Sequence, residues 1–292
     1  MLASGFAPRS KRDLRGAVKA CLAISPVGDC GTGPHGPIGE WDVSEVTDMS
    51  SLFRGAKSFN SDISKWQVAK VTDMHGMFEG ATAFNGDISK WDVSSVVSID
   101  GMFEGAASFN GDVSEWDMSS ATKTSSMFRG ATSFDSDISK WDLPKVTEMA
   151  SMFHGATSFD GDISSWDVSR VTDMTSMFQD ATSFKQDIST WKVSSVMSTR
   201  YMFYGATSFD ADISDWDVSR VTNMNRMFYG TPSFVRVLCG TAWADSKAQQ
   251  EHMFTQSGGR ICFGRDTGME HAQSTPLSLL VLSFGLHKNY HL

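Results

Sequence analysis

The sequence predicts a repeat solenoid in which eight consecutive coils of 25 residues stack into a rod. Three aromatic columns indicate this fold. Trp recurs every 25 residues from Trp41 to Trp216 without an insertion or deletion, and counted from that Trp, Phe fills positions thirteen and nineteen of every unit. A fixed period of this kind is typical of stacked repeats, whose units cannot bury their apolar side chains alone and complete one another's core.

Within one unit, the chain is expected to turn repeatedly around a central core. The unit has the pattern W-D-V-S-x-V-T-D-M-x-x-M-F-x-G-A-x-S-F-N/D-x-D-I-S-x, and its apolar positions mix steps of two, three and four. Neither a long strand nor a long amphipathic helix gives this mixture. We expect D-I-S-x-W-D-V to form the main strand and V-T-D-M a second short extended piece. M-F-x-G-A-x-S-F is expected to form a helical or 3-10 turn that ends at Gly.

The Trp column and the Met-rich position twelve are predicted to be core, since Met fills irregular gaps beside stacked rings. If exposed, they would instead offer a carbohydrate platform and a soft-metal site. Thr recurs at positions seven and seventeen, where side-chain hydrogen bonds to the backbone are expected. An ice-binding face is disfavoured, because Met occupies position nine and Val97 and Met197 interrupt the Thr column.

The composition excludes some partners. The formal net charge of −9 disfavours nucleic acid and anionic membranes, which attract concentrated Lys and Arg. The longest apolar run, Leu277 to Leu286, is shorter than the roughly 20 residues that a transmembrane helix needs. Residues 1–15 lack the features of a standard signal peptide. We therefore expect no nucleic-acid partner and no transmembrane span.

The repeat pattern of residues 41–64 resembles that of the BspA-like leucine-rich-repeat surface proteins, which are known from bacteria, mycoplasmas and marine microalgae. The resemblance covers about Ile38 to Phe234. The flanking segments L-R-G-A-V-K-A-C-L and L-C-G-T-A-W, with H-M-F following at 252–254, are similar to the terminal segments of algal members. The resemblance implies a right-handed leucine-rich-repeat-like β-solenoid with short parallel strands. It also implies display outside the cell and a role in adhesion or protein binding.

The repeat ends where Val237, Leu238 and Cys239 replace its Asp-Ile-Ser. Terminal units are expected to depart from the pattern because they close the last hydrophobic layer. We divide the chain into a disordered N-terminus (1–9), an N-terminal cap (10–37), the eight-repeat solenoid (38–234), a C-terminal cap (235–263) and an irregular tail (264–292).

The cysteines lie outside the eight units, with Cys21 and Cys30 on one side and Cys239 and Cys262 on the other. This division suggests one local disulfide in each cap, and therefore an oxidising compartment. The alternative is four reduced thiols in a cytosolic protein. With the family resemblance, the cysteines favour an extracellular or cell-surface location.

Position twenty-two carries a column of aspartates. Carboxylates stacked about 5 Å apart repel by about 1 kcal/mol per pair even in bulk water, so this column needs compensation. Hydrogen bonds from backbone N–H groups at the adjoining turn are the favoured source, and calcium bound between coils is the alternative. The column consists of Asp62, Asp87, Asp112, Asp137, Asp162, Asp187 and Asp212.

Catalysis has little support, since the His residues share no column and no nucleophile, metallohydrolase or phosphate-loop motif is present. We expect a non-enzymatic scaffold, with no cofactor, that binds a protein or a cell-surface ligand. A calcium- or glycan-binding extracellular structural module is the alternative. Recognition should lie where the units differ, at positions five, ten, eleven, fourteen and twenty-five. From these positions the predicted binding face takes Lys65, Lys70, Lys90, Lys140, Lys145, Arg170, Arg220, Tyr204 and Tyr229.

Overall fold

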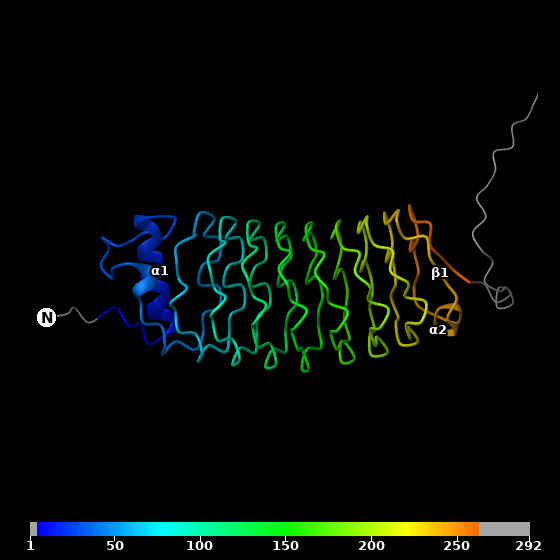
Figure 1. The fold of residues 1–292 in the computed structure, drawn as a ribbon, viewed down its shortest axis with the longest axis horizontal. Helices are drawn as coiled ribbons and strands as arrows, with labels where there is room; N and C mark the ends of the chain where they lie inside the picture. The colour runs from blue at the N-terminus through cyan, green and yellow to red at the C-terminus, as the bar shows by residue number, and fades with distance from the viewer. Residues whose placement is uncertain (1–4, 263–292) are drawn as a thin grey trace, which may run out of the picture.

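A computed structural model describes residues 5–262 and confirms the solenoid, with coils stacked along one long axis (Figure 1). Regular secondary structure lies at the two ends of the stack. Among the described residues, no helix is long and apolar enough to cross a membrane. The elements are α1 (Lys11–Ile24), a short 3-10 helix η1 (Ile38–Glu40), β1 (Val237–Leu238), α2 (Thr241–Ala244) and β2 (Arg260–Ile261).

A ladder of hydrogen bonds connects each coil to the next. The N–H groups of alternate residues from position nine to position fifteen donate to carbonyl oxygens of the following coil. In the second coil Met74, Gly76 and Phe78 donate over 2.9, 2.8 and 2.8 Å. Position eight forms one parallel bridge per coil, and we call the surface around positions seven to fifteen the ladder face. The rungs are Asp48, Asp73, Ser98, Lys123, Glu148, Asp173, Ser198, Asn223 and Gln249.

The ladder corrects two expectations about local structure. The parallel pairing lies in V-T-D-M, whereas D-I-S-x-W-D-V forms no strand in any described coil and instead makes turns. M-F-x-G-A-x-S-F is not helical. It is a series of turns, with positive φ at position fifteen inside the segment and at position eleven just before it, for example 68° at Gly130 and 57° at Ser126. A right-handed helix needs negative φ throughout, so position fifteen interrupts any helix along this segment.

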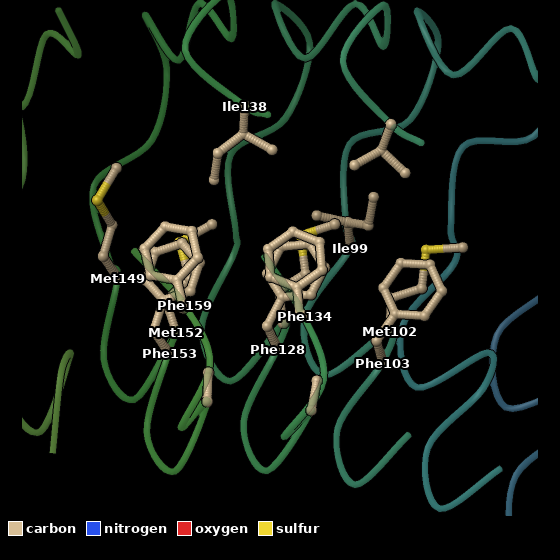
Figure 2. Packing of buried hydrophobic residues seen from close by; sticks show 14 of the residues in the cluster. Ile99, Met102, Phe103, Phe128, Phe134, Ile138, Met149, Met152, Phe153 and Phe159 are labelled. Carbon is tan, nitrogen blue, oxygen red and sulfur yellow. The ribbon is translucent and has the colours of Figure 1, made fainter. Parts of the chain in front are cut away.

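Stacked rings fill the core (Figure 2). In the fourth coil, the Phe128 ring lies 3.7 Å from that of Phe134, and 5.6 and 5.8 Å from those of Phe103 and Phe153 in the adjacent coils. The Trp side chains are only 2–4% exposed, and the Met side chains of position twelve are fully buried. The predicted burial of both columns is confirmed.

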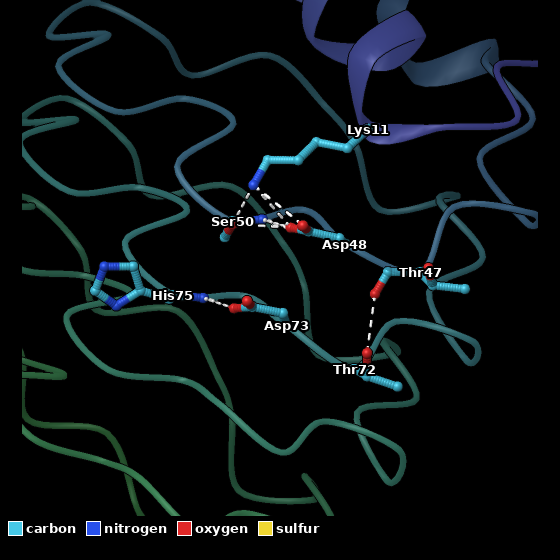
Figure 3. A network of polar contacts seen from close by, with 7 residues as sticks. All are labelled: Lys11, Thr47, Asp48, Ser50, Thr72, Asp73 and His75. Atoms are coloured by element: carbon cyan, nitrogen blue, oxygen red, sulfur yellow. Dashed lines mark hydrogen bonds and ion pairs between the residues drawn. The ribbon is translucent and has the colours of Figure 1, made fainter.

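Polar groups of one coil are satisfied by the coil before it. The indole N–H of Trp141 donates to the Val113 carbonyl at 2.9 Å, and that of Trp166 to the Ile138 carbonyl at 3.1 Å. The Thr72 hydroxyl donates to the Thr47 carbonyl at 3.3 Å (Figure 3). This confirms the expected hydrogen bonding of the Thr columns. A buried indole N–H without a partner would cost about 1–3 kcal/mol.

Helix α1 covers the first coil. Its apolar side chains, including Leu14 and Val18, are buried, and Cys21 is joined to Cys30 by the expected disulfide. Lys11 extends from α1 to the first rung, where its Nζ lies 3.0 Å from the Asp48 carboxylate and also contacts Ser50 (Figure 3). The helix therefore closes the open end of the core and is held there by covalent and polar contacts.

The expected disorder of residues 1–9 is wrong for residues 5–9. The Phe6 ring lies 5.1 Å from that of Trp41 and 4.0 Å from that of His35, and its carbonyl accepts the Asp42 N–H at 3.0 Å. Trp41 has no preceding Trp on which to stack, and Phe6 instead packs against it edge to face, at 72° between ring planes. Residues 1–4 and the expected irregular tail, with its apolar run at 277–286, lie outside the described residues.

A degenerate ninth coil follows the eight predicted ones. The Trp243 indole donates to the Ile213 carbonyl at 3.1 Å, and the Phe254 ring stacks on that of Phe228 at 5.5 Å. Strand β1 pairs in parallel with β2, and the expected Cys239–Cys262 disulfide joins the same two coils. The coil is irregular because Trp243 follows Trp216 by 27 residues instead of 25.

Candidate binding surface

Three of the basic residues predicted for binding are engaged between coils. Each forms an ion pair with the glutamate in the same column of the preceding coil. Exposed pairs of this kind contribute about 0–1 kcal/mol each, but they reduce the charge that the edge offers to a partner. The pairs are Lys65 with Glu40 (2.8 Å), Lys70 with Glu45 (2.5 Å) and Lys140 with Glu115 (2.6 Å).

Of the other predicted basic residues, Lys145 and Arg170 occupy position five of adjacent coils, whereas Lys90 and Arg220 lie apart from them along the rod. They share their edges with exposed aspartates of positions two and twenty-two. Hydrogen bonds from Ser89 hold the pKa of Asp87 below its usual range, and the charge of Lys90 lowers this pKa further. The expected basic bias is therefore offset by ionised carboxylates on the same edges.

The aspartates of position twenty-two are compensated as predicted. Each accepts a hydrogen bond from the N–H of the Ser two residues later, at 2.9–3.0 Å in all seven coils that carry this Asp. The Asn or Asp of position twenty adds a second series, as when Asn60 accepts the N–H of Asn85 at 2.9 Å. No group of three or more potential metal ligands is clustered among the described residues. Calcium binding stays a prediction.

The tyrosines Tyr204 and Tyr229 do form one site, at the C-terminal end of the ladder face. Their rings stack in adjacent coils with 5.0 Å between centroids and 7° between planes. Tyr201 meets Tyr204 edge to face at 5.8 Å. All three side chains are partly exposed. These rings form the polar-tipped aromatic platform of the site.

Two guanidinium groups border this platform. Arg200 and Arg226 both donate to the Tyr201 hydroxyl oxygen, at 3.1 and 3.0 Å, and the Arg200 guanidinium lies 4.6 Å from the centre of the Tyr201 ring. The hydrogen bond from Arg200, supported by Arg226, lowers the pKa of Tyr201. We call these five residues, Arg200, Tyr201, Tyr204, Arg226 and Tyr229, the Arg–Tyr cluster.

The cluster differs from the rest of the ladder face in its charge balance. On the ladder face, Arg54 lies 2.8 Å from the Glu79 carboxylate and Arg129 lies 3.0 Å from that of Glu104; outside this face, Arg236 lies 3.0 Å from that of Asp210. Within residues 5–262, by contrast, neither Arg200 nor Arg226 has a carboxylate within 4.0 Å. Their positive charge is therefore directed to solvent and to whatever binds there.

Tyr201 also occupies an unfavourable backbone position. Its φ is 58°, and that of Arg226 is 56°, at position eleven, which holds only Ser or Gly in the first six coils. Side chains larger than Gly are strained at positive φ, by roughly 1–3 kcal/mol for sparsely populated conformations. The Ser residues of this column share the same positive φ, so the strain itself belongs to the repeat. What distinguishes the last two coils is that large side chains replace Ser or Gly there without gaining core packing, which marks this surface as a candidate functional site.

Sequence reasoning identified two of the five residues of this site. Tyr204 and Tyr229 stood out as aromatic residues in a variable column. The other three were missed, although positions ten and eleven were among the variable positions: Arg200, Tyr201 and Arg226. The signal was present in Tyr201, a bulky residue in a Ser/Gly column.

The comparisons with known proteins agree with a repeat protein. The model of a family described as "Mycoplasma protein of unknown function, DUF285" matches residues 29–141 and 122–243. No curated protein matches the chain. One similar solved structure is titled "Crystal structure of TLR13-ssRNA13 complex", with 9% sequence identity and a TM-score of 0.25 over 87% of this chain. The match spans 45% of that chain, and its TM-score is too low to carry an argument.

Proposed function

This chain belongs to the family described as Mycoplasma protein of unknown function, DUF285, and from that premise we propose that it is a non-enzymatic scaffold that binds a protein or cell-surface partner. The finer assignment to the BspA-like surface proteins is part of the proposal, and its support is the repeat pattern of residues 41–64. A right-handed leucine-rich-repeat-like coil is supported by the strong preference of parallel crossover connections for that hand. The two cap disulfides support an extracellular or cell-surface location.

The Arg–Tyr cluster is the observation that carries this proposal. Tyr and Arg are enriched among the residues that dominate binding energy at protein interfaces. A tyrosine offers a large contact area and loses little side-chain entropy on binding. The stacking of Tyr204 on Tyr229 holds both rings before a partner arrives, which lowers that cost further.

The other large aromatic residues of the coils serve the fold. The Phe and Trp columns are buried, so they are not accessible to a partner. The ladder face of the first six coils carries Ser or Gly at position eleven and Arg, Glu, His or Gln at position fourteen, without a Tyr, Trp or Phe at either position. We therefore place the contact on the seventh and eighth coils.

A displayed library of random 12-residue peptides, panned against the full chain, tests this proposal. Enriched peptides are then titrated against three proteins: the unmodified chain, a Tyr204→Ser/Tyr229→Ser variant, and a Glu104→Ser control in the same column several coils away. We expect binding to the unmodified chain and to the control, and a loss of about tenfold or more in the tyrosine variant, because hot-spot side chains contribute about 2 kcal/mol or more each.

Two results would oppose the proposal. Enrichment of no peptide would argue against a protein-binding surface. Peptides that bind the tyrosine variant and the unmodified chain equally would place the contact elsewhere on the rod. Thermal melting of each variant checks that it is folded, which is expected because both tyrosines lie outside the aromatic core.

A further inference from the structure

We propose that the partner presents a short acidic segment, and that Arg200 and Arg226 bind its carboxylates while Tyr204 and Tyr229 receive the adjoining apolar side chain. The inference rests on the proposed function and names the chemistry of the partner at the same surface. It follows from the geometry of the two guanidinium groups, the charges around them and the length of the neutral surface on which they lie.

The two guanidinium groups converge on one atom. Both donate to the Tyr201 hydroxyl oxygen, so this residue orients them side by side. A guanidinium has five N–H donors in a planar fork. Because the Tyr201 oxygen takes one donor from each arginine, most of the donors are left for a ligand. Carboxylates match this fork with two parallel hydrogen bonds, which are about twice as strong as neutral ones.

The local charge of the cluster favours the same ligand and is opposite in sign to that of the rod. The chain has a formal net charge of −9, and its edges carry the aspartate columns described above, so the two arginines are a local exception. At the cluster the described residues supply two guanidinium groups and no neutralising carboxylate within 4.0 Å. Glu251 of the next coil accepts the Arg226 backbone N–H at 2.9 Å, but its carboxylate lies 3.6 Å from His252 and not within 4.0 Å of either guanidinium. The carboxylates of an acidic segment would neutralise the two guanidinium groups, whereas a basic segment would be repelled by them.

The rungs set the length of the segment. Position eight is neutral in the seventh, eighth and ninth coils, where Ser198, Asn223 and Gln249 lie, but it is Asp173 in the sixth coil and Glu148 in the fifth. Three coils at about 4.8 Å each span roughly 14 Å, or about four residues of extended chain. A longer polyanion, such as a nucleic acid or a sulfated glycan, would reach the carboxylates of the preceding rungs. The neutral surface therefore fits a short acidic peptide better than an extended polyanion.

The test uses each enriched 12-residue peptide as a fluorescein-labelled synthetic probe, titrated against the full chain by fluorescence anisotropy. A matched peptide carries Asn and Gln in place of Asp and Glu. The protein variants are Arg200→Gln/Arg226→Gln and the control Arg54→Gln/Arg129→Gln, whose arginines lie on the same face but are already paired with glutamates. A heparin fragment serves as the competing polyanion.

We expect the enriched peptides to be rich in Asp and Glu. Their affinity should fall about tenfold or more in the Arg200→Gln/Arg226→Gln variant and in the Asn/Gln peptide, because hydrogen bonds between charged groups are stronger than neutral ones. The control variant should bind normally, and binding should weaken as salt is raised from about 50 to 200 mM.

The failures of the two proposals are distinguishable. Neutral or basic peptides that need Tyr204 and Tyr229 but not the arginines would overturn the acidic partner and leave the binding surface standing. Tighter binding of heparin than of any acidic peptide would also overturn it, in favour of a glycan. If no peptide binds at the tyrosines, both proposals are wrong.

Discussion

Replacement of Phe128 by Ala tests the physical basis of the rod. Phe128 is fully buried in the fourth coil, and its ring stacks on Phe134 of the same coil and on Phe103 and Phe153 of the neighbouring coils, at 3.7, 5.6 and 5.8 Å. Truncation removes the ring from all three stacks at once. The third and fifth coils, which are separated by the fourth, would therefore both lose packing.

The expected cost is in the upper part of the range for such changes. A buried Phe replaced by Ala loses about 3–5 kcal/mol through transfer and cavity terms. Because the stacked rings on both sides hold the cavity open and limit its collapse, we expect about 4–5 kcal/mol. Phe254, in the ninth coil, is half-buried and stacks on Phe228 alone, at 5.5 Å, so Phe254→Ala should cost about 2 kcal/mol.

Urea unfolding followed by Trp fluorescence measures both losses, provided that the denaturant slope is unchanged. Arg129→Ala, at the adjacent residue, is the matched control. Its partly exposed ion pair with Glu104 should contribute no more than about 1 kcal/mol. A cost below about 1.5 kcal/mol for Phe128→Ala, or an equal cost for Phe254→Ala, would refute nearest-neighbour stacking as the source of stability.

Three further predictions concern the polar columns and the caps. Hydrogen bonds from Ser114 and Ser139 lower the pKa of Asp112 and Asp137, so their stabilisation is present above the usual value of 3.8 and is lost as the pH falls through the folded value. The urea midpoint should be steady from about pH 7 to 5 and fall below about pH 4, and less steeply in an Asp112→Asn/Asp137→Asn variant. Melting temperatures with added calcium and with chelator should coincide, because backbone N–H groups already compensate the aspartates of position twenty-two. A rise of several degrees with calcium would support the calcium-binding alternative. Removing the Cys239–Cys262 disulfide, which closes a loop of 23 residues, should lower the free energy of unfolding by about 3 kcal/mol on the chain-entropy model. It should also speed amide hydrogen exchange in β1 and β2. Unchanged exchange there would contradict a role of this disulfide in holding the ninth coil.

The core could be predicted from the sequence because it depends on period alone. Trp141 and Phe128 recur at fixed spacing, and stacking like on like follows from any coil of constant length. The local backbone could not be predicted in the same way. Whether Ser126 and Gly130 adopt positive φ depends on the hydrogen bonds that the next coil offers, and these are absent from the sequence of one unit.

The terminal coils and the binding site were harder to predict, because both are built from residues that depart from the repeat pattern. Trp243 belongs to the Trp column, but a strict period misses it because two residues are inserted before it. Lys65 resembles a binding residue until its partner Glu40 is seen in the preceding coil. Tyr201 could have been identified without its neighbours, because a large residue in a column of Ser and Gly already indicates a candidate binding surface.

The contact between the Arg–Tyr cluster and a partner can be measured most directly by photo-cross-linking. Photoreactive benzoylphenylalanine replaces Tyr204 or, as a control in the same column, Glu104, and each full chain is irradiated with an enriched acidic peptide. Benzoylphenylalanine keeps the aromatic body of Tyr204, so the site remains formed. We predict a covalent adduct from position 204 and none from position 104. An adduct from position 104 that equals or exceeds that from position 204 would contradict the assignment of binding to the C-terminal end of the ladder face.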